Sequence, residues 1–384
     1  MSAPGDAESL VRLRRAFEDN FQLGRECGAA LSVWKDGCEK LALHGGYCDA
    51  ARKRPWTPQT IVLVWSATKG PASACLLRAL HETGLETSVP VAEVWPEFAA
   101  EGKASITVAA MLSHCAGLCA VADRSLHVLD HDAVARCLSA QAPAWPPGDG
   151  HAYSPRAFGY VLEEMIRRLT GKTCGQYWRS AFGEPFDLDF WIGLPESEHN
   201  RAADALAPRA SAMAGEKTPF ARELSTPGTL TNAAFSAPAG ITGPTTMNSP
   251  AMRSACLPAF GGIGSASALA KFYGLLATSE PGLLPQEILA ACSRPLSNGF
   301  DRVLHRETAF STGFMLDPRD SHNQLIRRTF GSSPSAFGHP GAGGSLAFAD
   351  PENRIGFAYV MNQMEPGALP RERTQRLVRA LYGI

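Results

Sequence analysis

The sequence predicts an α/β domain, an antiparallel sheet flanked by helices, that carries an inserted all-helical domain. Short runs of strand-like composition, separated by turn residues, occur before residue 66 and again after residue 309. Between them, apolar residues recur mostly at helical spacing, with breaks at long loops rich in Pro and Gly. At 384 residues, the chain is long enough for two domains of about 150 residues each. We therefore expect a discontinuous α/β domain, residues 1–76 and 288–384, and a mainly helical domain, residues 77–287.

The N-terminal elements follow from periodicity and turn residues. Four apolar residues at helical spacing predict an amphipathic helix from Ser9 to Arg25. Three short runs rich in β-forming residues come next, and the turn Lys35-Asp36-Gly37 separates the first two. They predict an antiparallel meander with strands at Ala29–Trp34, Lys40–His44 and Thr60–Trp65.

The middle and the end of the chain are assigned in the same way. Helical pieces are expected at Val108–Leu112, Arg156–Leu169 and Ser265–Ala277. After residue 309 the strand pattern returns, at Phe310–Met315, Leu346–Ala349 and Ile355–Met361. A last helix is expected from Arg371 to Leu381.

Charge and hydropathy exclude several classes of partner. Lys and Arg number 36 and Asp and Glu 37, so the net charge is −1 and no global field attracts nucleic acid or an anionic membrane. No apolar stretch approaches the ~20 residues that span a bilayer, and the first residues do not have the pattern of a signal peptide. We therefore expect a soluble, cytoplasmic protein whose partner is a small molecule or a modest protein surface.

The ten cysteines are scattered and are expected to be reduced, buried side chains rather than disulfides. The close pair Cys115 and Cys119 has no second pair at zinc spacing nearby. His127 and His131, with Asp130 and Asp132 beside them, could hold a metal if the segment is helical, but a solvated polar segment is the favoured interpretation. No metal or cofactor is expected.

A serine with an adjacent amine is the first candidate for chemistry. Ser66-Ala67-Thr68-Lys69 follows an apolar run and opens a helical stretch, where positions i and i+3 share one face about 5–6 Å apart. Burial would lower the pKa of Lys69, so that its amine could take the proton of the Ser66 hydroxyl. A second copy of the pattern, Ser32 to Lys35, lies in a strand-like run where i and i+3 point to opposite faces. The side chains of Ser32 and Lys35 are therefore not expected to meet, and the second copy is not a candidate site.

Two later motifs could complete a site. Tyr153 lies between a Pro/Gly-rich loop and a predicted helix, where its phenol could relay a proton or simply fill the edge of the core. The segment Phe337 to Ser345 contains four Gly and one Pro, so its backbone could approach a substrate carbonyl closely or form a tight turn at a strand edge.

Taken together and in order, Ser66-x-x-Lys69, Tyr153-Ser154 and His339-Pro340-Gly341 resemble the serine β-lactamase and penicillin-binding-protein superfamily. Within it, the sequence is most similar to class C β-lactamase-like family VIII carboxylesterases. Further segments agree in register over nearly the whole chain: Ile106–His114, Gly117-Leu118, Ile192–Pro195 and Phe348–Pro351. The resemblance implies the β-lactamase/DD-peptidase-like fold, with the active site in the cleft between the two domains.

The resemblance also implies a role for each site residue. Ser66 would be the acylated nucleophile, Lys69 its general base and Tyr153 the proton relay. The backbone N–H groups of Ser66 and Ala342 would form the oxyanion hole. Three more residues would line the substrate-binding surface: Trp65, His339 and Gly341.

Two departures from the superfamily pattern bear on the substrate. Pro155 stands where β-lactamases have Asn, so it offers no side-chain amide to a substrate. His339 stands where they have Lys, which removes a fixed charge for a substrate carboxylate. The sequence therefore predicts a serine hydrolase of short or medium acyl esters. The alternatives are an acyltransferase, a weak β-lactamase or D-amino-acid peptidase, and a catalytically silent binding protein.

Overall fold

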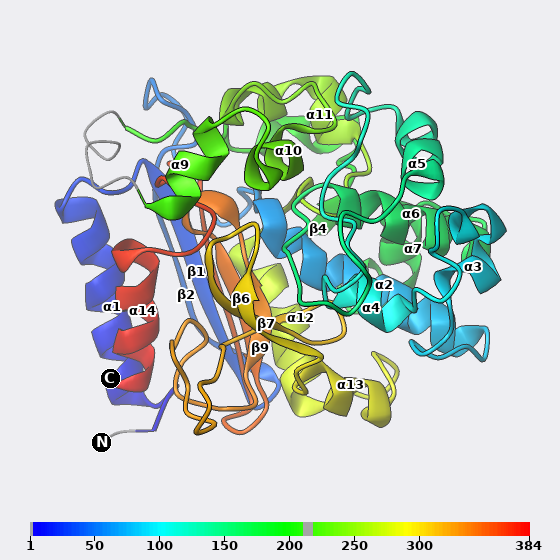
Figure 1. Ribbon diagram of the computed structural model, residues 1–384. Helices are drawn as coiled ribbons and strands as arrows, with labels where there is room; N and C mark the ends of the chain where they lie inside the picture. The colour runs from blue at the N-terminus through cyan, green and yellow to red at the C-terminus, as the bar shows by residue number, and fades with distance from the viewer. Residues whose placement is uncertain (1–2, 210–217) are drawn as a thin grey trace.

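The computed structural model describes residues 3–209 and 218–384, and it confirms an α/β fold with an antiparallel sheet (Figure 1). The larger sheet has eight strands in the order β2-β1-β11-β10-β9-β8-β7-β6, and every neighbouring pair is antiparallel. Its strands are β1 (Gly28–Lys35), β2 (Cys38–Gly46), β6 (Ser297–Asp301), β7 (Arg306–Phe310), β8 (Met315–Leu316), β9 (Phe337–Pro340), β10 (Leu346–Asp350) and β11 (Ile355–Met361). The two ends of the chain therefore build one sheet.

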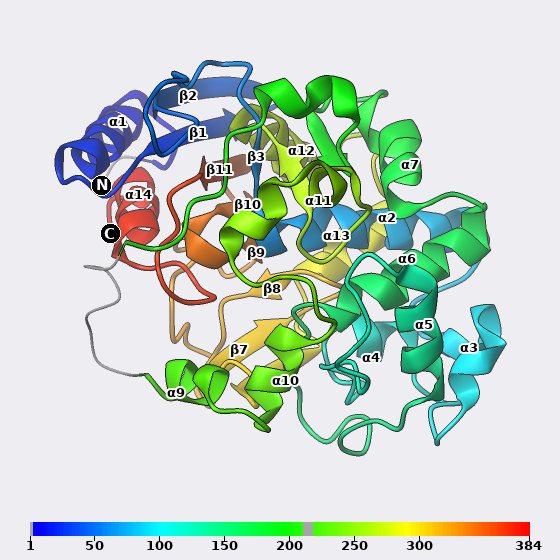
Figure 2. The same cartoon turned by 90° about the horizontal axis from the view of Figure 1, so that it is seen from above.

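Helices cover both faces of this sheet. The terminal helices α1 (Ala7–Gln22) and α14 (Glu372–Tyr382) lie side by side over one face (Figures 1 and 2). Helix α12 (Ala266–Thr278) packs on β1, β10 and β11 from the other face. Gly356 of β11 permits this contact, because a Cβ there would lie 2.1 Å from the Ala270 carbonyl oxygen. Although α12 falls in the range 77–287 expected for the helical domain, its apolar surface is buried against the sheet.

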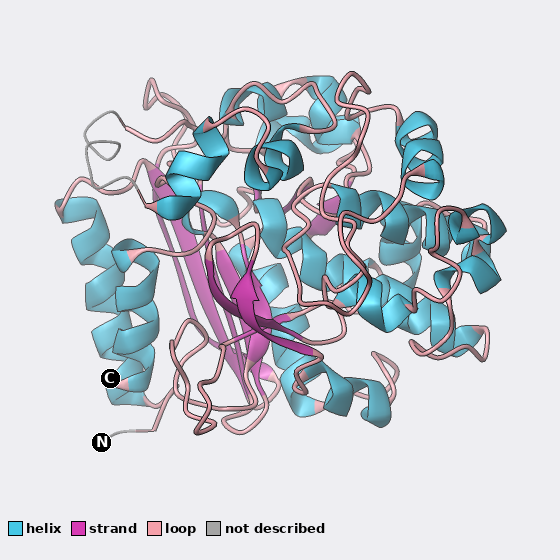
Figure 3. Cartoon of the chain, in the orientation of Figure 1, coloured by secondary structure: helices cyan, strands magenta, loops and turns pink. Residues whose placement is uncertain are grey.

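Most of the remaining helices gather beside the sheet, on the side away from α1 and α14, whereas α9 lies near the start of α14 (Figures 1 and 3). Helix α2 packs on α6 and α7, and α5 packs on α6. In the described residues the remaining helices are α2 (Lys69–Glu82), α3 (Val91–Val94), α4 (Val108–Leu112), α5 (His131–Ala140), α6 (Ala157–Thr170), α7 (Cys174–Trp178), α9 (Pro219–Ser225), α10 (Leu230–Ser236), α11 (Pro250–Ser254) and α13 (Gln286–Cys292). No helix in the described part of the chain is both long and apolar enough to cross a bilayer.

Two of the expected strands differ from the structure in their length or in the strand with which they pair. The strand expected at Thr60–Trp65 shrinks to β3 (Val62–Leu63), which joins β5 (Gly262–Gly264) and β4 (Phe190–Ile192) in a separate three-stranded sheet. The meander therefore stops after β2. The single strand expected at Phe310–Met315 is instead a hairpin, in which β7 ends at Phe310 and β8 begins at Met315. In the turn between them, Gly313 has φ +92°, a left-handed conformation that glycine adopts without strain.

Candidate active site

Ser66 lies in a tight turn that leads directly into a buried helix. The 3₁₀ turn η1 (Trp65–Thr68) follows β3 and runs into α2, and the Thr68 hydroxyl accepts a hydrogen bond from the Gly262 N–H at 2.8 Å. Trp65 has φ +52°, a left-handed conformation that costs a non-glycine residue about 1–3 kcal/mol. Both Trp65 and Ser66 are partly exposed, whereas Lys69 is buried. The turn therefore presents the serine to solvent and keeps the amine inside.

The Lys69 amine has three oxygen neighbours. Its Nζ lies 3.4 Å from the Ser66 Oγ, 3.1 Å from the Pro155 carbonyl oxygen and 2.9 Å from the Ala259 carbonyl oxygen. Burial without a carboxylate partner holds the pKa of Lys69 well below the usual lysine value. A neutral amine can donate its two N–H groups to the carbonyl oxygens and direct its lone pair at the Ser66 hydroxyl. This geometry suits a general base.

Tyr153 completes the group from the loop before α6. Its ring centroid lies 4.8 Å from the Lys69 Nζ, and its side chain is almost fully buried. Burial raises the pKa of the phenol, an effect opposed by a hydrogen bond with the Ser66 side chain and reinforced by the charge of Asp301. The phenol therefore keeps its proton at neutral pH and can act as a donor, while Lys69 is the group able to accept one.

The glycine-rich segment brings β9 against the serine turn. A Cβ on Gly341 would lie 2.1 Å from the Val64 carbonyl oxygen, so only glycine allows this approach. Ala342 is the next residue and begins the 3₁₀ turn η6 (Ala342–Gly344), whose first N–H has no partner inside the turn. Ser66 stands near the start of η1 in the same way. The close approach of Gly341 to Val64 therefore places the Ala342 segment next to the Ser66 turn, and an oxyanion hole formed by their N–H groups stays a prediction.

Two buried histidines border the site in neutral form. His339, on β9, has its ring centroid 5.9 Å from that of Tyr153, and its Nδ1 bonds the Pro340 carbonyl oxygen at 2.8 Å. Burial, with the nearby Lys69, lowers the pKa of His339 to about 3. Burial likewise holds the pKa of His114 well below its usual value, and its Nδ1 accepts a hydrogen bond from the Ser154 N–H at 3.2 Å. The structure thus adds His114 to the residues that border the site; in the sequence its only signal is its place in the matching segment Ile106–His114.

The other residues that the sequence offered as candidates for chemistry lie outside this site. Ser32 bonds Glu39 at 2.7 Å and Lys35 bonds the Pro4 carbonyl oxygen at 2.6 Å, so the second Ser-x-x-Lys copy forms no pair. His127 lies before α5, which begins at His131, so the two histidines do not share a helix face. Within residues 3–209 and 218–384, no cluster of His, Cys, Asp or Glu is arranged to hold a metal. All ten cysteines are among these residues and are free thiols.

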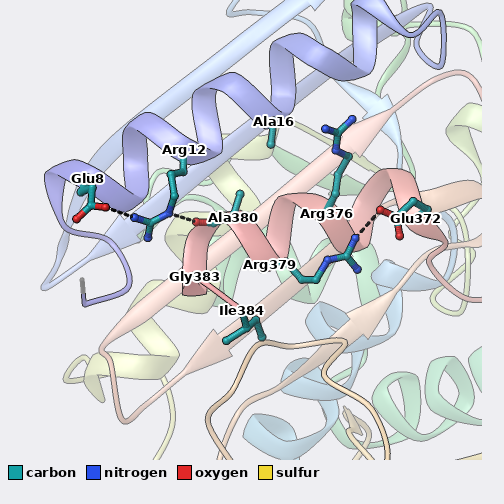
Figure 4. Close-up of a pocket in the computed structure, with 9 residues that line it drawn as sticks. All are labelled: Glu8, Arg12, Ala16, Glu372, Arg376, Arg379, Ala380, Gly383 and Ile384. Carbon is teal, nitrogen blue, oxygen red and sulfur yellow. Dashed lines mark hydrogen bonds and ion pairs between the residues drawn. The ribbon is translucent and has the colours of Figure 1, made fainter. Parts of the chain in front are cut away.

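A surface groove of 590 Å³ is lined by residues of α1 and by α14 with the C-terminal residues that follow it, and by none of the candidate site residues (Figure 4). Arg12 spans it, bonding Glu8 at 2.8 Å and the Ala380 carbonyl oxygen at 3.3 Å, while Arg379 pairs with Glu372 on α14. Of these contacts, the one between Arg12 and the Ala380 carbonyl oxygen joins the two terminal helices. We therefore interpret the groove as a gap in the packing of α1 against α14 and not as part of the candidate site.

The fold and the Ser-x-x-Lys turn at the start of a buried helix define the β-lactamase-like class of hydrolases. The chain belongs to the Beta-lactamase family, whose model matches residues 13–381, and the resemblance seen in the motifs is confirmed.

Individual relatives agree with this assignment. "Esterase/beta-lactamase LipL" of Mycobacterium tuberculosis is 30% identical over 366 residues, which cover 91% of this chain and 80% of LipL. The structure of a penicillin-binding protein homologue from Caulobacter crescentus is 35% identical with a TM-score of 0.86, covering 100% of this chain and 99% of that one. A family VIII carboxylesterase is 33% identical with a TM-score of 0.85 and the same coverage.

Proposed function

We propose that this protein hydrolyses carboxylic esters of small molecules, with short or medium acyl chains, through an acyl-enzyme on Ser66. The observation that carries the proposal is the buried Lys69 amine, which has two carbonyl acceptors for its N–H groups and the Ser66 hydroxyl within 3.4 Å. The esterase activity named for LipL and for the family VIII carboxylesterase supports the choice of substrate.

The proposed reaction has two halves. In the first, the Ser66 Oγ attacks the ester carbonyl carbon while Lys69 takes the hydroxyl proton, and the N–H groups of Ser66 and Ala342 stabilise the oxyanion. As the C–O bond breaks, Tyr153 gives its proton to the departing alkoxide and recovers one from the Lys69 ammonium. In the second half, water attacks the acyl group with the same residues in the reverse roles, and the acid is released.

The same residues favour esters over β-lactams. The Pro155 carbonyl oxygen accepts a hydrogen bond from Lys69, and proline has no side-chain amide to hold an amide substrate. His339 is neutral at physiological pH, so it supplies no fixed positive charge for the carboxylate of an antibiotic. Trp65 and Gly341 would lie along the bound ester, on either side of the nucleophile.

The test compares two serines that share the Ser-x-x-Lys pattern. Ser66→Ala should lower turnover of p-nitrophenyl butyrate by several orders of magnitude, whereas Ser32→Ala, in a strand, should retain it. An intact-mass measurement should find the acyl group or a fluorophosphonate label on the wild type and not on Ser66→Ala. Turnover by Ser66→Ala, or a wild type that neither turns over esters nor takes the label, would refute the proposal and favour a silent binding protein.

An acyl-chain series with nitrocefin in parallel ranks the substrates. We expect butyrate-length esters to be cleaved and nitrocefin to be cleaved poorly. The same assay with an added alcohol distinguishes hydrolysis, which releases the free acid, from acyl transfer, which forms a new ester.

A further inference from the structure

A buried carboxylate on the β6–β7 hairpin holds the backbone of the Tyr153 loop. Asp301 is at the end of β6, and its side chain is fully buried. The Tyr153 N–H points between its two oxygens, with the nitrogen 3.1 Å from Oδ1 and 3.2 Å from Oδ2. The sequence separation is 148 residues, so this contact joins a sheet edge to the loop that precedes α6. Asp301 thus fixes the main chain at the residue whose phenol enters the site.

The same carboxylate satisfies several further donors. The Val303 and Leu304 N–H groups each donate to Oδ1 at 2.9 Å, and the Thr308 hydroxyl donates to Oδ2 at 3.1 Å. The Thr308 Oγ1 in turn lies 2.7 Å from the His151 Nε2, two residues before Tyr153. A carboxylate accepts at about four lone-pair positions, whereas an Asn amide would direct an N–H₂ group at donors. The surroundings therefore favour aspartate at this position, and an asparagine could keep only the contacts made to Oδ1.

The hairpin also holds the ring of Tyr153. Phe310, at the end of β7, stacks on Tyr153 with ring centroids 6.1 Å apart and an interplanar angle of 11°. His114 packs edge-on against the same phenylalanine at 4.4 Å. The β6–β7 hairpin thus contacts Tyr153 in two ways: Asp301 holds its backbone by hydrogen bonds, and Phe310 packs on its phenol ring.

We propose that Asp301 is a positioning residue for Tyr153, holding the phenol where it can protonate the leaving alcohol. This inference rests on the ester hydrolysis proposed above. A displaced phenol would slow the step in which the C–O bond breaks, and it would do so most when the departing oxygen needs a proton. A p-nitrophenolate leaves without one, because p-nitrophenol is a much stronger acid than phenol or an alkyl alcohol.

The experiment measures how the effect of the mutation depends on the leaving group. For Asp301→Ala, kcat for phenyl and ethyl butyrate should fall by about 100-fold, the loss that a displacement near 1 Å can produce. For p-nitrophenyl butyrate the fall should be clearly smaller, and KM should change little for all three esters. Asp301→Asn, which keeps one oxygen acceptor for the Tyr153 N–H, should restore part of the loss. This conservative variant also tests the proposal if Asp301→Ala does not fold.

Asp317, which directly follows β8 of the same sheet, provides a matched control. Its buried carboxylate accepts the Thr329 and Phe330 N–H groups at 3.0 Å each, but that segment contributes no residue to the candidate site. Asp317→Ala should lower the melting temperature as Asp301→Ala does, without a dependence on the leaving group. Equal losses on all three esters, or Asp301 variants that behave like Asp317→Ala, would overturn the positioning role. Failure of the proposed function itself appears separately, as turnover that survives Ser66→Ala.

Discussion

The contact between Gly341 and the serine turn allows a quantitative prediction. In Gly341→Ala, the new Cβ would lie 2.1 Å from the Val64 carbonyl oxygen, two residues before Ser66. An ordinary van der Waals contact begins near 3.4 Å, so the two segments must separate by about 1.3 Å. Both partners belong to strand-linked backbone, and no flexible side chain can move aside. The separation would widen the distance between the Ala342 and Ser66 N–H groups.

The expected loss follows from that displacement. Moving one oxyanion donor out of range costs about 10²–10³ in kcat, or about 2.7–4 kcal/mol of transition-state stabilisation. Overpacking of the folded chain should cost a further ~1–3 kcal/mol of unfolding free energy. We therefore expect Gly341→Ala to remain folded, to melt earlier and to be at least about 100-fold slower on p-nitrophenyl butyrate.

Two glycine controls separate the site effect from general damage. Gly28→Ala, on β1, meets the Tyr47 carbonyl oxygen at 2.2 Å but lies outside the candidate site, so it should lower stability and leave kcat unchanged. Gly243→Ala meets nothing within 4 Å and has an extended backbone, so it should change neither. Concentrations of active enzyme are set by fluorophosphonate titration. If Gly341→Ala matches Gly28→Ala in both kcat and melting temperature, the close approach does not shape an oxyanion hole.

The remaining predictions concern pH and packing. Because Lys69 must be neutral to accept a proton and burial lowers its pKa, kcat/KM should fall as the pH falls through that lowered pKa. In the unfolded chain Lys69 stays protonated up to about pH 10.5, whereas in the folded chain it loses its proton at a lower pH. The free energy of unfolding, measured by urea titration, should therefore fall as the pH drops below about 10.5. A free energy of unfolding that does not change with pH would contradict the lowered pKa of Lys69. The pH–rate profiles of His339→Gln and the wild type should have the same shape near pH 6.5, because burial keeps His339 neutral there. If the wild-type profile changes slope near pH 6.5 and the variant's does not, His339 titrates in that range and the prediction is wrong. Gly356→Ala should lower the unfolding free energy by about 1–3 kcal/mol in urea melts, because its Cβ would lie 2.1 Å from the Ala270 carbonyl oxygen of α12; an unchanged midpoint would show that the helix can shift freely.

Elements with a strong local signal were predicted well. The last helix matches its expected range closely because its apolar residues recur at helical spacing, and β11 matches because it is an unbroken run of apolar and β-forming residues. The missed strands β6 and β9 have neither signal: β6 reads Ser-Asn-Gly-Phe-Asp and β9 Phe-Gly-His-Pro. These segments are strands because they pair with neighbouring strands, β6 with β7 and β9 with β10, and not because of their own composition.

The sequence alone located the proposed nucleophile and its proposed base, because Ser66 and Lys69 are three residues apart and a helical turn brings such a pair together. It also located Tyr153 and the His339–Ala342 segment through the order of the motifs. Only the tertiary structure decided what surrounds them: the carbonyl oxygens of Pro155 and Ala259 around Lys69, the Val64 contact at Gly341, and the Asp301 carboxylate behind Tyr153. These contacts join residues up to 277 positions apart, and their burial shifts the pKa values, so no local pattern in the chain encodes them.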